Sequence, residues 1–549
     1  MICVGICNIA AKFRVIASSD IFGSMYNGSW HHHDDSAEAP PNRIRIREGY
    51  GMAQIIERGN DGFYHPKSED DLIALIQHAR DNKLKVRVRG SGHSSANASI
   101  YTGDFESPSQ SNPNIDIYMD QMCGVTFDEA NMLATVEAGC HIGHDLEDIA
   151  GVSTAHNSFM SRLQAKGWAL PITGGIARQT IGGFLAMGSS GGSLTYSLLD
   201  ALQHIRVVDG TGTVQEFNRD DNNLDDPFWA VGVSMGLLGI VTSVTFKCIE
   251  TYNIKGQETT SRDDKCPVDC FGDGSSGRPS AAQFFKDTPY GRMMWWPQRG
   301  IEKIIVWEAE RIPAEANFKP KPYQEFAPIL GSTKPAQIAA SLLFRLYGFI
   351  NPPGPQGILQ NIAAAVLKPL FPLIVNSFLA SGMKGPQKFQ DYWCDGVPMD
   401  DRIDYTLIPV KFSELWIPVD RTKEVFNKIR DHFRTHDITQ VGTFTVEVYA
   451  TPANNFWLSP AYQRDVIKYD MFWFAKNPGD PERDFYPQFW QLLDEFDYRP
   501  HWGKFLPGDV ARLSSSYPRW DDFMALRDTM DPDQIFVTDY WRRHLGIEA

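Results

Sequence analysis

Apolar and polar positions follow a helical period and then a strand period between residues 66 and 89. A segment resembling a capping box, Pro66-Lys-Ser68 with acidic residues after it, precedes apolar residues at helical spacing up to Asn82: Leu72, Ile73, Leu75, Ile76 and Ala79. Lys85–Arg89 then alternates basic and apolar residues, as a strand does. Further strands are predicted at Ile115–Tyr118, Met132–Glu137 and Ile205–Val208, with a turn at Asp209–Gly212. Residues 50–250 are therefore predicted to form an α+β unit.

The pattern changes after Tyr252. Residues 261–279 are polar and rich in glycine, and aromatic runs follow at 293–297 and 471–474. This change predicts a domain boundary near residue 255. At the other end, residues 1–48 are expected to be a flexible leader, because residues 30–45 are rich in Asp, Ala, Pro and His.

Residues 336–383 form a long apolar segment. Leu346 to Leu367 carry no charge, but Asn351-Pro-Pro-Gly-Pro355 would break any helix at its middle, so the segment is not predicted to span a membrane. Two short amphipathic or buried helices, a membrane-surface patch and a hydrophobic lid over an apolar substrate all fit this pattern. The sequence does not choose between them.

Composition places the chain among globular proteins that do not bind nucleic acid. It has 549 residues with 42% hydrophobic and 22% charged residues, and its formal charge of −15 comes without a basic stripe. Eight cysteines without zinc spacing predict neither a disulfide scaffold nor a metal site. Lys12 and Arg14 interrupt the first apolar pieces, so no secretory signal is predicted, and a cytoplasmic or membrane-associated location is favoured over secretion.

A loop with two glycines follows the predicted strand at 85–89. Gly90 and Gly92 permit positive φ and close backbone approach, so successive N–H groups can converge on an anion such as a diphosphate. Alone this is half of a G-x-G-x-x-G fingerprint, and a simple turn with a surface histidine fits equally well. The predicted cradle consists of Arg89, Gly90, Ser91, Gly92, His93 and Ser94.

A second block, residues 169–193, combines glycines and small residues with interleaved apolar ones. The interleaving predicts buried structure rather than a flexible linker. Such a stretch brings backbone close to a large flat ligand. The groups predicted to bind this ligand are Gly174, Gly175, Thr180, Gly183, Ser189, Ser190 and Ser193.

These two blocks, together with Phe228–Phe246, resemble the FAD-binding domain of the vanillyl-alcohol-oxidase-type (PCMH-type) flavoproteins in order and spacing. The resemblance implies that two α+β subdomains hold FAD, with its pyrophosphate on the 89–94 loop and with Ile240 and Val241 along the flavin or the adenine. It implies that His93 is joined covalently to the flavin as a histidyl–FAD bond. Ser189 falls where a residue of the family controls oxygen access.

The C-terminal part resembles the aldonolactone oxidase and alditol oxidase branch of this family. Arg499-Pro-His-Trp-Gly-Lys504, with the segments 530–536 and 540–546, is similar to its closing segment. The resemblance implies an FAD-binding domain at 49–255, and an α+β substrate domain at 256–498 with an antiparallel sheet and a helical apolar insertion near 336–383. It also implies that 499–549 returns to the FAD domain.

The same resemblance implies four catalytic residues. Lys504 would accept the hydroxyl proton or stabilise reduced flavin, His501 would touch the flavin ring, and Glu447 would accept a hydrogen bond from the substrate hydroxyl. Tyr449 stands where the branch usually has arginine. Tyrosine offers one hydroxyl and an apolar ring, which favours a bulkier, less polar substrate over a standard sugar lactone or alditol.

The function implied is that of an FAD-dependent oxidoreductase similar to D-arabinono-1,4-lactone oxidase. It would oxidise a CH–OH group of a sugar lactone, a polyol or a bulkier alcohol, with dioxygen as the acceptor and H2O2 as the product. Two alternatives stay open. One is a membrane-associated dehydrogenase that passes electrons to a quinone or a cytochrome, and the other is a non-catalytic flavin-binding protein.

Overall fold

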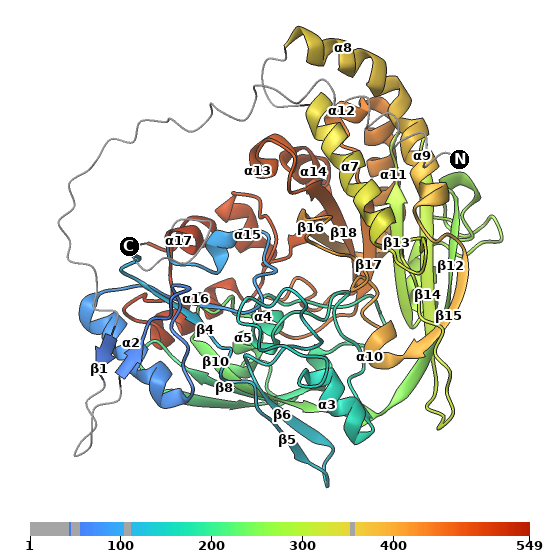
Figure 1. Ribbon diagram of the computed structural model, residues 1–549. Helices are drawn as coiled ribbons and strands as arrows, with labels where there is room; N and C mark the ends of the chain where they lie inside the picture. Colours follow the sequence, from blue (N-terminus) through green and yellow to red (C-terminus); the bar gives the residue numbers. More distant parts are fainter. Residues whose placement is uncertain (1–42, 46–54, 104–110, 352–356, 549) are drawn as a thin grey trace. The chain divides into compact units, whose positions relative to one another are not determined.

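A computed structural model describes residues 43–45, 55–103, 111–351 and 357–548 (Figure 1). The expected leader, 1–48, lies outside these residues except for the short strand β1 (Arg43–Arg45), which pairs with β2 (Ile55–Glu57). The segment tested for a secretory signal also lies outside them.

The first part of the fold holds two small layers of strands. The predicted helix is α2 (Glu69–Asn82), and the Asp71 N–H donates to Oγ of its N-cap Ser68 at 3.3 Å, which confirms the predicted start. The predicted strands at 85–89 and 115–118 are also confirmed as β3 (Val86–Arg89) and β4 (Ile115–Tyr118), which pair in parallel.

A five-stranded antiparallel sheet lies beside this layer, in the order β5-β6-β10-β8-β9. It confirms the strands predicted at 132–137 and 205–208. Side chains alternate between buried and half-buried along β10, so one face of the sheet is packed against the core. Its strands are β5 (Val125–Asp128), β6 (Leu133–Glu137), β8 (Leu202–Val208), β9 (Val214–Asn218) and β10 (Ile240–Lys247).

An eight-stranded antiparallel sheet makes up most of the rest, in the order β15-β12-β14-β13-β17-β18-β16-β19. The boundary expected near residue 255 falls inside its strand β12. Its strands are β12 (Tyr252–Arg262), β13 (Tyr290–Trp296), β14 (Lys303–Pro313), β15 (Gln387–Tyr392), β16 (Val410–Pro418), β17 (Val446–Thr451), β18 (Val466–Phe474) and β19 (Arg499–Pro500). β7 (Trp168–Ala169) and β11 (Ile249–Glu250) form a separate two-stranded pair.

Side chains point alternately to the two faces along each strand of this second sheet, and helices pack on both faces. On β13, Trp295 packs against Phe426 of α11 with ring centres 5.2 Å apart, whereas Met294 and Trp296 belong to a cluster with α7 and α9. The helices after α2 are α3 (Phe159–Lys166), α4 (Ile181–Ala186), α5 (Phe228–Val231), α6 (Ala281–Asp287), α7 (Lys334–Ile350), α8 (Ile358–Leu367), α9 (Phe371–Ser381), α10 (Trp393–Gly396), α11 (Thr422–Thr435), α12 (Ile438–Val441), α13 (Pro481–Asp484), α14 (Pro487–Leu492), α15 (Val510–Ser516), α16 (Trp520–Met530) and α17 (Asp539–Leu545).

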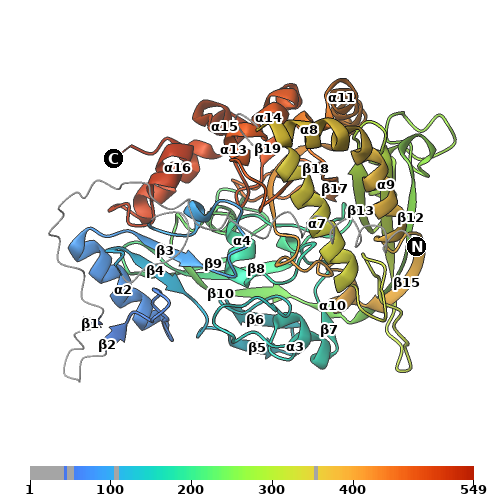
Figure 2. The same cartoon turned by 45° about the horizontal axis from the view of Figure 1, so that its top comes forward.

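The apolar segment at 336–383 folds as three helices, α7, α8 and α9, whereas one of the three alternatives left open by the sequence had two short helices (Figure 2). Their inner sides pack into the cluster that holds Met294 and Trp296. By length and composition, Gln360–Ser381 is apolar enough to cross a membrane, and 22% of its most apolar window is buried. The segment therefore packs on the sheet with one side and leaves much apolar surface outside.

The C-terminal segment packs against the first layer of strands. The Val86 N–H donates to the Ile535 carbonyl at 2.8 Å, and the Lys85 Nζ donates to the Gln534 carbonyl at 2.8 Å. Ile535 and Phe536 share an apolar cluster with α2, β3 and β4. The last part of the chain therefore holds β3 in place, directly before the glycine loop.

Candidate active site

One large cavity brings together the segments that the sequence singled out. It contains about 1740 Å³ of empty space, its open mouth included. Its walls are the segment after β3, the 174–190 block, residues 235–241, one face of the second sheet, and 501–504. Every predicted site residue lines it except Ser193, whose Oγ accepts hydrogen bonds from the Thr195 and Tyr196 N–H groups at 3.0 and 2.9 Å.

The glycine loop after β3 has the features of an anion cradle. Within the described chain, no N–H group from Gly90 to Ser94 donates a hydrogen bond to another residue. Gly92 has a φ of +79°, and a Cβ on Gly90 would lie 2.2 Å from Oγ1 of Thr180. The loop therefore needs glycine at both positions, and it presents several free donors to one ligand.

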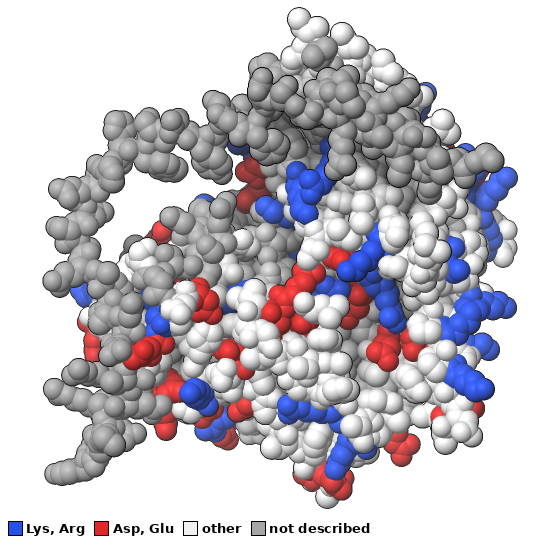
Figure 3. Space-filling view, in the orientation of Figure 1, with Lys and Arg blue, Asp and Glu red and all other residues white. Residues whose placement is uncertain are grey.

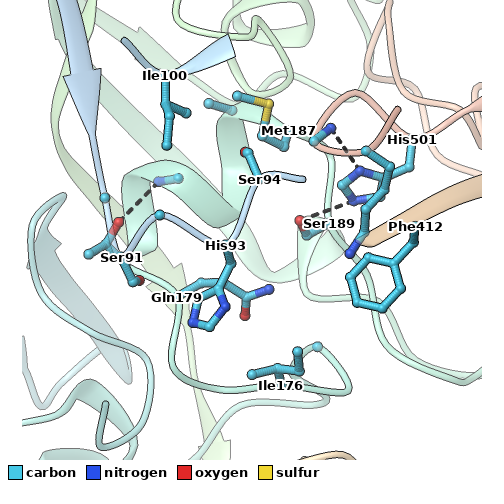
Figure 4. A pocket seen from close by; sticks show the side chains of 18 of the residues that line it. Ser91, His93, Ser94, Ile100, Ile176, Gln179, Met187, Ser189, Phe412 and His501 are labelled. Atoms are coloured by element: carbon cyan, nitrogen blue, oxygen red, sulfur yellow. Dashed lines mark hydrogen bonds between the residues drawn. The ribbon is translucent and has the colours of Figure 1, made fainter. Parts of the chain in front are cut away.

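His93 follows the glycines and points into the cavity near Gln179 (Figure 4). Its Nε2 atom is buried and has no hydrogen-bond partner among the described residues. Burial is the main reason that the pKa of His93 is lowered to about 4, so the imidazole is neutral at neutral pH. A neutral imidazole keeps a lone pair that can form a bond.

These features fit FAD. Unused backbone donors suit a diphosphate, and the small residues of the 174–190 block leave room for a large flat ring. Arg89 donates to the Ser91 carbonyl at 3.2 Å and lies over the Tyr118 ring, so it places positive charge beside the loop. The cofactor-binding residues would be those of the 89–94 loop, of the 174–190 block and of 240–241.

Three carboxyl groups form a row across the second sheet at the other side of the cavity. Glu414 on β16 pairs in register with Asp470 on β18, and Asp470 pairs with Glu447 on β17. All three line the cavity and are almost completely buried. Of the three, the sequence indicated only Glu447.

Burial and the repulsion between neighbouring carboxylates determine which of these three groups are protonated. The pKa of Glu447 is raised well above its ordinary value by burial and by the charge of Asp400. The pKa of Asp470 is raised in the same way by burial and by Glu414. Burial would also raise the pKa of Glu414, but His501 in its protonated form, Lys468 and Lys504 outweigh it and the pKa is lowered. The row therefore carries one negative charge, on Glu414, and two protons.

Tyr449 lies beside the row and donates its hydroxyl to Asp400. Asp400 in turn pairs with Arg292, a fully buried side chain that also donates to Glu325 at 2.8 Å and to the Tyr323 hydroxyl at 3.0 Å. The Tyr449 hydroxyl is therefore occupied within the protein, and its ring is the part left toward the cavity.

Two lysines place positive charge at the cavity. Lys468 pairs in register with Tyr449, its Nζ lies 4.8 Å from the centre of that ring, and it donates to the Ser190 and Gly191 carbonyls at 2.9 and 3.0 Å. Lys504 Nζ lies 3.7 Å from the centre of the Phe412 ring. An ammonium is attracted to an aromatic face, so this contact favours Lys504 as a cation.

His501 is held in one tautomer. Its Nδ1 accepts the Gly503 N–H at 2.9 Å, so the proton of the neutral ring lies on Nε2, which is 3.3 Å from the Ser189 Oγ (Figure 4). Burial is the main reason that the pKa of His501 is lowered to about 4. His501 is therefore a hydrogen-bond donor in this arrangement, without a free lone pair.

Sequence reasoning missed five charged residues at or beside this site: Arg292, Asp400, Glu414, Lys468 and Asp470. Lys468 and Asp470 stand on alternate positions of a strand that ends in an aromatic run. A polar residue at every second position of an otherwise apolar strand was the signal that could have found them.

Comparisons of sequence agree with this site. A family model for D-arabinono-1,4-lactone oxidase matches residues 374–544, and one for an FAD binding domain matches residues 61–218. L-gulono-1,4-lactone dehydrogenase of Mycobacterium tuberculosis is 25% identical over 488 residues, which cover 88% of this chain and 95% of the relative. L-gulonolactone oxidase of Mus musculus is 22% identical, covering 87% of this chain and 93% of the relative.

Solved structures share the fold. Cholesterol oxidase from B. sterolicum has a TM-score of 0.62 at 15% identity, covering 92% of this chain and 96% of the other. A chitooligosaccharide oxidase has a TM-score of 0.52 at 13% identity, covering 87% and 90%. The α+β architecture with two domains is therefore that of FAD-linked oxidases.

We expect His501 to make the folded protein less stable as the pH falls from 6.5 to 4. The unfolded chain takes up a proton near the ordinary pKa of 6.5, whereas the folded state does so only near 4, so stability is lost in this window. The contribution is at most about 1.4 kcal/mol per pH unit for one proton. Melting temperatures measured across this window should fall less steeply for His501→Asn than for the wild type.

The matched control is His156→Asn at an exposed histidine. It should keep the wild-type pH dependence. Equal slopes for His501→Asn and the wild type would contradict the buried neutral state. The flavin content of each sample is checked by absorbance, since loss of cofactor would also lower the melting temperature.

Proposed function

We propose that this protein oxidises a CH–OH group of an aldonolactone. The chain belongs to the aldonolactone oxidase branch of the vanillyl-alcohol-oxidase-type flavoproteins and is an FAD-dependent oxidoreductase. The row of Glu414, Asp470 and Glu447 carries this proposal, because it lies in one cavity with the glycine cradle. When bound, FAD supplies the acceptor for the hydride that leaves the substrate carbon.

The carboxyl row is suited to bind a substrate with several hydroxyl groups. Neutral Glu447 and Asp470 can each donate and accept a hydrogen bond, whereas an ionised carboxylate only accepts. The wall beside the row is apolar: Phe412 and Phe472 lie two positions from Glu414 and Asp470 on the same strands, and Phe444 adjoins them. A hydroxylated ring can therefore be oriented with its polar edge on the row and a less polar part on the aromatic wall.

We assign the hydroxyl proton to the ionised member of the row. Hydride leaves a carbon more readily when the hydroxyl proton moves to a base at the same time. Glu414 carries the negative charge of the row, while His501 has both ring nitrogens engaged. Lys504, as a cation above Phe412, would instead stabilise the negative charge that develops at the cofactor.

Tyr449 takes the place of the branch's arginine but has no hydroxyl to spare for the substrate. The cation at this position is Lys468, in register on the next strand. Its ammonium is directed at the Ser190 and Gly191 carbonyls, so it would support the loop beside the flavin rather than hold the substrate. This arrangement favours a substrate with fewer anionic or carbonyl groups at that end.

We also propose a covalent bond between the His93 ring and the methyl carbon on the flavin benzene ring. The bond would replace one hydrogen of that carbon and the hydrogen of the imidazole nitrogen, and dioxygen would take up the two electrons and two protons. The neutral, buried and unpartnered imidazole supports this proposal.

We propose dioxygen as the acceptor for reduced cofactor, with H2O2 as the product. Relatives named as oxidases support this proposal, while the dehydrogenases among the relatives and the small Ser189 beside His501 are compatible with either acceptor. Should a lipid-soluble acceptor act instead, the membrane-surface contact that we infer for residues 336–383 would bring the protein to it.

A substrate screen tests the activity. We expect L-gulono-1,4-lactone or D-arabinono-1,4-lactone to bleach the flavin absorbance under anaerobic conditions, and air to restore it within seconds. Slow restoration by air, with fast restoration by a quinone, would contradict the oxidase proposal. Bleaching by cyclohexanol but by neither lactone would replace the aldonolactone with an apolar alcohol, and no bleaching by any donor would favour a non-catalytic flavoprotein.

Glu414 and Glu447 form a matched pair for the proton assignment. Glu414→Gln removes the only charge of the row while still accepting the Trp416 N–H bond, so we expect kcat/KM to fall roughly 100-fold or more. Glu447→Gln replaces a neutral group with another, so we expect a loss of less than about tenfold. A larger loss in Glu447→Gln, with both variants retaining flavin, would show that Glu447 is the ionised group.

The covalent bond is tested by acid precipitation. We expect yellow fluorescence to stay with the wild-type pellet and to move to the supernatant for His93→Ala. Wild-type flavin that is released by acid would disprove the bond without affecting the assignment of the cofactor. Ser94→Ala, next to His93 on the same loop, is the control and should keep the flavin in the pellet.

A further inference from the structure

The outer faces of α7, α8 and α9 form an exposed apolar surface. Of the twelve large hydrophobic residues that are exposed in the described chain, ten lie between 329 and 373. Eight of these ten are on or between the three helices, and we call their surface the helical surface: Ile338, Leu342, Phe349, Ile358, Ile362, Val366, Leu370 and Leu373. An apolar patch of this kind on a folded protein marks a binding surface.

Both sides of these helices are apolar. On α7, Leu343, Phe344 and Tyr347 pack inward against the second sheet, while Leu342 and Phe349 are 53% and 54% exposed. An ordinary surface helix has a polar outer face, and a helix that is apolar all round has apolar surroundings. Among the residues that the structure describes, protein supplies these surroundings on the inner side only.

The charge of this region is opposite to that of the whole chain. Residues 326–390 contain five basic residues and no acidic one, whereas the protein has a formal charge of −15. None of the five has its charged group within 4.0 Å of a described carboxylate, while Lys334 and Lys368 act at longer range on Asp404 and Asp437. The five are Lys334, Arg345, Lys368, Lys384 and Lys388. Figure 3 shows white atoms at the very top of the view, where α8 lies.

We propose that the helical surface docks onto lipid bilayers that contain anionic lipids. The exposed apolar side chains would enter the boundary between headgroups and acyl chains, and the basic side chains would contact the headgroups. Anionic lipid is thus the partner that we assign to the membrane contact of residues 336–383. This assignment does not depend on which substrate the enzyme oxidises.

The contacts of α8 and α9 favour lying on the bilayer over crossing it. Phe371, Val375 and Leu379 are buried against the sheet, and the Asn376 Nδ2 donates to the Gly300 carbonyl at 2.7 Å. Crossing would require these contacts to break, and Lys368 would enter the hydrocarbon layer. Docking leaves the fold unchanged.

Other occupants fit less well. A two-fold dimer through this surface would bring the same basic residues of two copies together, which is unfavourable. A lid over the substrate would have to line the cavity, and no described residue between 334 and 383 does so. Only an anionic, apolar partner satisfies both the charge and the exposed side chains.

Vesicle flotation tests the proposal with the full-length flavoprotein. We expect it to float with phosphatidylcholine vesicles that contain phosphatidylglycerol, and to float poorly with phosphatidylcholine alone or in high salt. Lys368→Glu should weaken binding roughly 30-fold, since each charge near the surface contributes a factor of about five. Ile362→Gln combined with Leu373→Gln should weaken it roughly tenfold or more.

The matched control is Leu146→Gln combined with Ile149→Gln, the two exposed large hydrophobic residues of the described chain that lie outside 329–373. It should bind vesicles like the wild type. Absence of flotation, equal flotation of all variants, or protein that resists alkaline carbonate extraction would overturn surface docking. So would a wild-type dimer, in light scattering without vesicles, that Lys368→Glu converts to a monomer.

Flavin bleaching by substrate in solution separates this proposal from the enzymatic one. The Lys368→Glu variant should keep wild-type flavin content, melting temperature and bleaching rate, because Lys368 does not line the cavity. Vesicle binding without bleaching would leave docking intact and overturn the proposed activity instead.

Discussion

The burial of Arg292 is the constraint on which the active site depends. An unpaired buried guanidinium is strongly unfavourable, so the fold surrounds it with Asp400, Glu325 and the Tyr323 hydroxyl. Asp400, paired with Arg292, accepts a hydrogen bond from the Tyr449 hydroxyl and helps to raise the pKa of Glu447. Burial and the nearby Asp400 raise the pKa of Glu447, and they outweigh Arg292, which lies 3.8 Å from the Glu447 carboxyl group and lowers its pKa.

Local patterns predicted the cofactor side of the site well, and cross-strand pairing explains why the rest was missed. The capping box, the strand at 85–89 and its glycine loop are local in sequence, so they could be recognised there. Glu414 and Asp470 meet only through the register of β16 with β18, which no local pattern reveals. The partner of Tyr449 lies in a loop 49 residues upstream. Arg292 gave no signal because a single arginine in an aromatic strand does not show what it will pair with.

The sequence also could not show which serine hydroxyl groups face a ligand and which bind the protein backbone. Ser189, Ser190 and Ser193 looked equivalent as donors to a ligand, yet only the first two line the cavity. Ser193 instead satisfies two backbone N–H groups of the following turn. Serine serves both purposes equally well, so composition cannot separate them. Glycine is more informative, because the close approach of Gly90 to Thr180 leaves no alternative residue.

The second sheet links the cavity to the helical surface through one layer of aromatic rings. Phe444 lines the cavity, packs on Phe472 with ring centres 5.3 Å apart, and stacks on Phe344 of α7 at 4.1 Å. Beyond the carboxyl row this face of the sheet is apolar, so it requires a cover, and α7 and α9 provide it with their inner sides. Because the outer side of this helix layer is apolar as well, it also requires an apolar cover. A bilayer would provide it there, and would hold the aromatic wall of the cavity within one helix layer of the lipid.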